Sequence, residues 1–94
     1  MNEQQKKRAT ELYNLIERNI TVLTANTSAR RPVEWMSESY ANRLNLILRD
    51  IRILLEGVPG LRYLSEIPEG KDSRPLEVIL LLNDYIYLLD ARLN

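Results

Sequence analysis

Acid–base or hydrolytic chemistry in this sequence would have to come from carboxylates. The chain has 13 acidic residues but neither histidine nor cysteine, so the commonest general base and metal ligand, the thiolate nucleophile and the disulfide are all missing. Glu34 and Glu38 lie four residues apart, and Asp84 and Asp90 six apart, but neither pair has the Glu-x-x-His pattern of metal sites in bundles. The three glycines lack phosphate-loop spacing. We therefore expect solvated surface carboxylates, no metal or cofactor, and a protein that is not an enzyme.

Arginine supplies ten of the thirteen basic residues, and it is the side chain best suited to contact phosphates and bases. Arg30, Arg31 and Arg43 are the candidates for contact with an anionic ligand, a nucleotide or nucleic acid. However, the 13 acids balance the 13 bases, and acids are interleaved with bases throughout the chain. Because no recognition motif is visible either, we rank this function second.

A polar notch interrupts the apolar face of the middle segment. At about 100° per residue, Ser39, Arg43 and Asp50 project within roughly 40° of one another. Buried charges are costly unless paired, which leaves two readings. Either the notch lies at the edge of a bundle and Arg43 reaches into solvent, or Arg43 of one chain meets Asp50 of another. The candidate interaction residues are Trp35, Ser39, Arg43, Leu46, Asp50 and Ile53, of which Trp35 is equally suited to a core.

The pattern Arg-Pro-aliphatic-Glu occurs twice, at residues 31–34 and 74–77. Proline is favoured at the first position of a helix, where its missing N–H needs no partner, and an acid two residues later lies near the positive end of the helix dipole. The sequences that follow the two copies share nothing position by position. We therefore interpret the repeat as two helix starts and not as a duplicated binding site.

The apolar residues predict helices over residues 3–24, 32–56 and 75–93. In the first, Ala9, Leu12, Ile16 and later residues recur at spacings of three and four. In the second, an apolar arc of about 200° is twice what one packed face needs, so this helix should be buried on two sides. The third segment could instead form a β-hairpin, with its turn at Asn83-Asp84. Its unbroken leucine-rich run favours a helix.

The stretch from 57 to 74 reads as an ordered loop because it contains the three glycines and two of the four prolines. One short helical turn is expected within it, at residues 61–66, and the apolar residues Leu61, Tyr63, Leu64 and Ile67 should hold it against the core. The fold class is therefore all-α: a single domain, residues 1–94, that forms a three-helix antiparallel bundle. The third helix is expected to pair with the second as a hairpin.

The surplus apolar surface of the second and third helices would need cover. Self-association, as a homodimer or larger oligomer, or binding to another helical protein would supply it. The favoured function is thus a small non-enzymatic interaction protein, acting as an oligomer or as a subunit of a larger complex. A small phage or accessory protein that inhibits a host target by surface binding is a further alternative. With no apolar signal region and no run long enough to span a bilayer, we expect a cytoplasmic or otherwise intracellular protein and no membrane partner.

Overall fold

The computed structural model describes residues 1–29, 36–68 and 73–94, and within them it is all-helical. Three α-helices, α1 (Glu3–Thr27), α2 (Glu38–Leu54) and α3 (Pro75–Leu93), are joined by loops and one turn of 3-10 helix, η1 (Leu61–Tyr63). The molecule is an elongated bundle of 44 × 21 × 20 Å. The third predicted segment forms the helix α3 and not a β-hairpin.

The starts of α1 and α3 are each determined by local interactions of their first residues. At the start of α1, Asn2 Oδ1 accepts a hydrogen bond from the Gln5 amide at 2.8 Å, and Gln5 Oε1 accepts one from the Asn2 amide at 3.0 Å. This reciprocal capping satisfies two amides that have no partner inside the helix. At the start of α3, Pro75 occupies the first turn as the repeat predicted.

Helix α2 begins later than predicted. Ser37 is its N-cap, and the Ser37 hydroxyl accepts a hydrogen bond from the Tyr40 amide at 3.2 Å. Met36 and Ser37 are not helical, so the predicted start at Pro32 is wrong for this helix, although Pro32 itself lies outside the described residues. A serine cap explains the difference because its side chain replaces a missing intrahelical acceptor. The end is close to prediction: α2 stops at Leu54, before Gly57 with its φ of 83°.

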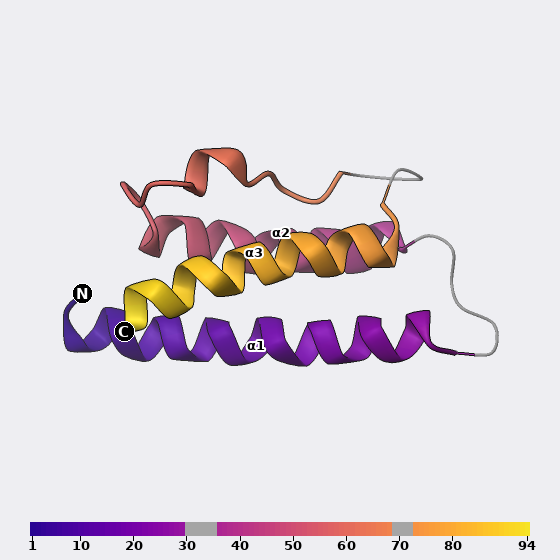
Figure 1. Ribbon diagram of the computed structural model, residues 1–94, viewed down its shortest axis with the longest axis horizontal. Helices are drawn as coiled ribbons and strands as arrows, with labels where there is room; N and C mark the ends of the chain where they lie inside the picture. Colours follow the sequence, from indigo (N-terminus) through magenta and orange to yellow (C-terminus); the bar gives the residue numbers. More distant parts are fainter. Residues whose placement is uncertain (30–35, 69–72) are drawn as a thin grey trace.

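The predicted antiparallel order is wrong for one pair of helices. Figure 1 shows α1 running one way and both α2 and α3 running back the other way, so α2 and α3 are parallel. After α2 the chain runs back toward the start of α3 through residues 56–68, here called the return segment. It lies on the side of α2 and α3 away from α1, and the Met36 amide donates to the Ser73 carbonyl at 3.0 Å where the two helices start. Helix α3 therefore packs antiparallel against α1 and does not form a hairpin with α2.

The core lies between the three helices and is filled mainly by leucine and isoleucine. Leu44 and Ile51 of α2 are buried, as are Tyr85 and Leu89 of α3. Burial of such side chains is the main source of stability in a domain of this size. The predicted face of α1 is confirmed: Ala9, Leu12, Ile16 and Leu23 are buried, and Ile20 is half-buried.

Candidate interaction surface

The outward side of α2 carries five of the six predicted interaction residues. We call this set, Ser39, Arg43, Leu46, Asp50 and Ile53, the α2 outer face. All five are exposed, and the buried residues of α2 lie on the opposite side of the helix. Leu46 and Ile53 are 59% and 70% exposed, so the prediction that the apolar arc is buried on two sides is wrong in this sector. Trp35, Arg30 and Arg31 lie outside the described residues.

Asp50 of the α2 outer face has a partner within its own chain. Arg8 of α1 donates from its guanidinium to Asp50 Oδ2 at 2.9 Å, and the same guanidinium lies 3.4 Å from Glu11. About half of each side chain in the Arg8–Asp50 pair is exposed, so the pair contributes little to stability. Arg43, by contrast, forms no ion pair with any of the described residues. The notch therefore lies at the bundle edge, with one side chain paired and one extended toward solvent.

A second outward face lies on α3 and was missed as a possible interaction site. Leu76 and Leu80 are each 62% exposed, and Tyr87 is 74% exposed. Together with Asn83 they follow a spacing of four, three and four residues, which places them on one side of a helix. We call Leu76, Leu80, Asn83 and Tyr87 the α3 outer face. None of these four residues was among the predicted interaction residues.

Polar side chains of α2 fix the return segment. Asn45 is buried, and its amide group donates to the Ile67 carbonyl at 2.9 Å and accepts from the Ile67 amide at 2.7 Å. Arg52 donates to the Leu64 carbonyl at 2.7 Å and to the Tyr85 hydroxyl at 3.1 Å. The Tyr85 hydroxyl in turn donates to the Ser65 carbonyl at 2.9 Å. Asn45 and Arg52 of α2 thus supply hydrogen-bond partners to main-chain groups of the return segment.

An ion pair adds to these contacts at the edge of the return segment. Arg49 Nε lies 2.8 Å from Glu66 Oε1, and a second nitrogen of the same guanidinium lies 3.1 Å from the other oxygen. This two-point hydrogen bond lowers the pKa of the Glu66 carboxyl below its ordinary value of 4.5. The carboxylate is therefore the stable form at neutral pH.

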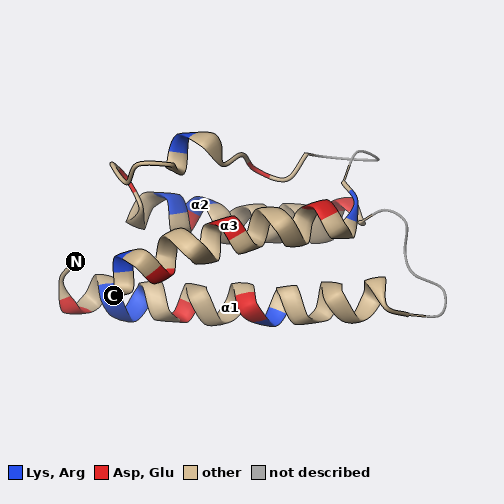
Figure 2. Ribbon diagram, viewed as in Figure 1, with Lys and Arg blue, Asp and Glu red and all other residues tan. Residues whose placement is uncertain are grey.

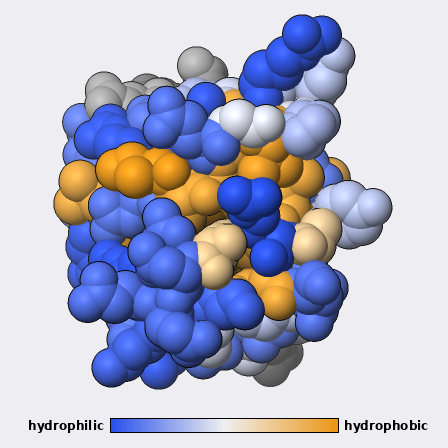
Figure 3. Space-filling view, turned by 90° about the vertical axis from the view of Figure 1, so that its left-hand side faces the viewer, coloured by the Kyte–Doolittle hydropathy of each residue, from blue (hydrophilic) through white to orange (hydrophobic). Residues whose placement is uncertain are grey.

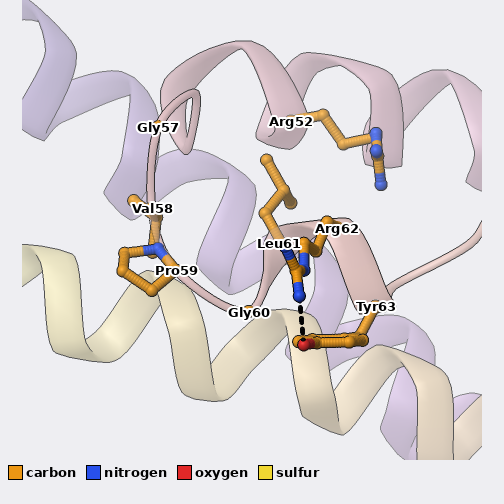
Figure 4. Close-up of a pocket in the computed structure, with 8 residues that line it drawn as sticks. All are labelled: Arg52, Gly57, Val58, Pro59, Gly60, Leu61, Arg62 and Tyr63. Carbon is orange, nitrogen blue, oxygen red and sulfur yellow. Dashed lines mark hydrogen bonds between the residues drawn. The ribbon is translucent and has the colours of Figure 1, made fainter.

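A hollow of about 600 Å³ lies beside η1 and is open to solvent. Two arginines line it, but they do not converge. Figure 4 shows the Arg62 guanidinium directed at Tyr63, to whose hydroxyl it donates at 2.7 Å, while the Arg52 guanidinium lies well away. Tyr63 is 74% exposed, so its predicted place in the core is wrong, whereas Ile67 is buried and Leu61 and Leu64 are half-buried as expected. The hollow offers no unengaged pair of cations for an anion.

The candidate carboxylate pairs were expected to be solvated surface charges, and only Asp84 and Asp90 both lie within the described residues. No group of three or more acidic side chains close enough to hold a metal ion is found in that part of the chain. Asp84 and Asp90 are exposed and diverge by roughly 120° around α3. Glu38 is exposed in the first turn of α2, and Glu34 lies outside the described residues.

The charges of the described residues do not separate into two poles. Residues 1–62 carry a net charge of +3 and residues 63–94 a net charge of −3. Figure 2 shows, however, that the charged start of α1 lies next to the charged end of α3, because the two termini meet at one end of the bundle. The fold thus brings charged residues of the two halves of the sequence close together, so their opposite net charges favour head-to-tail association only weakly.

The end of the bundle that holds both termini has its own apolar surface. Figure 3 shows this end, with a hydrophobic centre surrounded by hydrophilic residues. The partly buried apolar residues near this end are Met1, Leu54 at the end of α2, Val58 of the return segment, and Leu88 and Leu93 of α3. Because each is partly covered by its neighbours, this end exposes less of any one side chain than do the outer faces of α2 and α3.

Comparison with known proteins adds no relative from which a role could be transferred. No helix in the described residues is both long enough and apolar enough to cross a bilayer. No family model matches the chain, and neither a curated protein nor a solved structure matches it. The contacts and exposed faces of the chain itself are therefore what a functional argument has to use.

Proposed function

We propose that this chain is a small non-enzymatic interaction protein that acts through helix–helix contacts, as an oligomer or as a subunit of a larger complex. One observation carries the proposal: five large apolar side chains are more than half exposed on the outward faces of two helices. They are Leu46 and Ile53 on α2 and Leu76, Leu80 and Tyr87 on α3. Single exposed apolar residues are ordinary, but rows of them at helical spacing are typical of surfaces that bind another protein.

The chemistry of the outer faces supports contact with a helix in preference to a small molecule. Both faces are convex sides of helices, and each presents side chains at alternating spacings of three and four residues, the arrangement that packs against another helix. A small-molecule site needs a concave pocket with converging polar groups. The arginines of the described hollow are engaged by Tyr63, Tyr85 and the Leu64 carbonyl instead.

Photo-crosslinking tests the proposal at the faces themselves. A benzoylphenylalanine placed at Leu46 or at Leu80 should give a cross-linked product larger than 11.0 kDa in the cells that make the protein. The same group at Asn14, which is exposed on α1 away from both rows, is the matched control and should give none. If neither face gives a product, or if Asn14 gives the same products as both faces, the interaction proposal is wrong.

A further inference from the structure

We infer that the α2 outer face binds the same face of a second copy of this chain, with the two α2 helices antiparallel. This inference rests on the proposed function, because it names the partner of one of the two exposed faces. It follows from three properties of the face: the spacing of its residues, the arrangement of its two charges, and its contrast with the α3 outer face.

The spacing of the α2 outer face is that of a helix-pairing seam. Ser39, Arg43, Leu46, Asp50 and Ile53 are separated by steps of four, three, four and three residues. At about 100° per residue they fall within roughly 80° of arc, as narrow as the seam of two paired helices. The seam runs almost the full length of α2 from Glu38 to Leu54, about 25 Å at 1.5 Å per residue.

The two charges of the seam are arranged symmetrically about its centre. Arg43 and Asp50 lie on opposite sides of Leu46, three and four residues away from it. In an antiparallel pair with the two-fold axis beside Leu46, each Arg43 comes to the level of Asp50 in the second copy, within about one residue of rise. Leu46 then meets its own copy, and Ser39 faces Ile53. A two-fold interface requires such self-complementarity, in which residue i meets j and j meets i.

The charges of one chain leave these contacts available. Arg43 has no ion-pair partner among the described residues. Arg8 binds only one oxygen of Asp50, Oδ2 at 2.9 Å, and about half of the Asp50 side chain is exposed. A carboxylate can accept hydrogen bonds at both oxygens. Asp50 can therefore hold Arg8 of its own chain and Arg43 of the second copy together, which leaves neither charge unpaired in the interface.

The α3 outer face lacks this self-complementarity. Acidic Glu77, Asp84 and Asp90 border its row of apolar residues, whereas Arg74 and Arg92 lie only at the two ends of the helix. Two antiparallel copies of α3 would bring six carboxylates along one seam, and like charges at that distance repel. Charge thus selects the α2 outer face for self-association, and the α3 outer face fits a partner with a basic border.

The α2 seam contributes only two large apolar residues from each chain, so the contact is small. Interfaces at the small end of the size range give weak and reversible association. We expect a dissociation constant of roughly 10 µM to 1 mM, which a monomer–dimer equilibrium measured by analytical ultracentrifugation resolves.

A charge exchange tests the antiparallel arrangement. Arg43→Glu and Asp50→Arg should each weaken the homodimer at least tenfold, because each places like charges opposite one another twice in the two-fold pair. An equimolar mixture of the two variants should form a heterodimer of about twice the 11.0 kDa chain mass, because both contacts are then between opposite charges. Asp84→Arg, a charge reversal at an exposed residue of α3, is the control and should leave the wild-type equilibrium unchanged. Circular dichroism verifies that each variant is folded.

Two outcomes would overturn the inference. A wild-type chain that stays at 11.0 kDa up to millimolar concentration does not pair through α2. A wild-type dimer that neither single variant weakens, or that the mixture fails to restore, pairs through some other surface. Both results are distinguishable from failure of the proposed function, because cross-linking at Leu80 to another protein would leave that proposal standing.

Discussion

The Asn45 side chain bonds both main-chain groups of Ile67, as a neighbouring β-strand would. Its amide group donates to the Ile67 carbonyl and accepts from the Ile67 amide, so an extended stretch of chain is held against a helix without a strand beside it. Ile67 is buried, and its main-chain groups would be costly to leave without partners. The residue is thus a structural anchor of the return segment.

Replacing this anchor should destabilise the protein measurably. Asn45→Ala removes both partners of Ile67 and should lower the free energy of unfolding by about 2–4 kcal/mol. Asn42→Ala changes an exposed residue of the same helix and should stay within about 0.5 kcal/mol of wild type. Urea denaturation of both variants measures the difference. Equal stabilities would mean that Asn45 does not hold Ile67.

The Arg49–Glu66 pair should make the return segment sensitive to acid. Since the pKa of Glu66 is lowered in the folded chain, the pair stabilises the fold fully above pH 4.5, and this contribution is lost as the pH falls through the folded pKa. Glu66→Gln removes the titrating group. The stability difference between wild type and this variant should therefore be largest near neutral pH and shrink as the pH falls below about 4.5, as measured by urea denaturation at a series of pH values. A difference that grows in acid would contradict the pairing.

At the residue scale, the sequence predicts which side of a helix a polar residue lies on more readily than it predicts the group to which that residue bonds. Helical spacing places Asn45, Arg49 and Arg52 on one side of α2, but their partners lie 12 to 22 residues further along an aperiodic loop. Periodicity carries no information on which main-chain groups of such a loop will need partners. Leu46 and Ile53 were predicted as interaction residues because the apolar arc of their helix is wider than one packed face, and both are exposed.

Helix α2 shows how far periodicity alone determines an element. Its core face was predictable, and Leu44 and Ile51 are buried. Its start was not, because Pro32 and Ser37 are both acceptable start signals, and the choice depends on contacts beyond the segment. The Met36 amide, bonded to the Ser73 carbonyl, is one such contact. Helix boundaries are therefore less predictable than helix faces.

The two sides of α2 should respond oppositely to the same substitution. Ile51→Asp places an unpaired carboxylate at a site with no exposure, at a cost of several kcal/mol against a total of roughly 5–10 for so small a domain. We expect this variant to lose most of its helical circular dichroism. Ile53→Asp, two residues later and 70% exposed, should keep the wild-type spectrum and unfolding midpoint at low protein concentration. If both variants stay folded, or if both unfold, the assignment of the core face is wrong.

At the scale of the whole molecule, the direction of α3 is the feature that the sequence left open. An amphipathic helix has the same apolar pattern whether it runs up or down, and a connection of about 20 residues can either turn back at once or cross the length of α2. The return segment crosses, and its contacts with Asn45, Arg52 and Tyr85 stabilise that choice. The parallel order of α2 and α3 thus depends on aperiodic polar contacts, which is why helix number and helix faces were predictable and topology was not.

A single spin label distinguishes the two topologies. The natural chain has no cysteine, so Glu56→Cys gives one attachment site at the end of α2. In the structure Glu56 borders a hollow shared with Leu88, Ala91 and Arg92 of α3. The label should therefore broaden the amide resonances of this end of α3 far more than those of Leu76 and Glu77, which lie about 22 Å along the helix from Ala91 and Arg92.

A label at the other end of the bundle is the matched control. Asn26→Cys, near Met36 and Pro75, should give the reverse pattern, with far more broadening at Leu76 and Glu77 than at Ala91 and Arg92. A hairpin of α2 and α3 would bring Glu56 close to the start of α3, because the chain would turn back directly. Stronger broadening of Leu76 and Glu77 than of Ala91 and Arg92 by the Glu56 label would therefore rule out the parallel arrangement. It would also remove the return segment from α2, and with it the reason why Asn45 is buried.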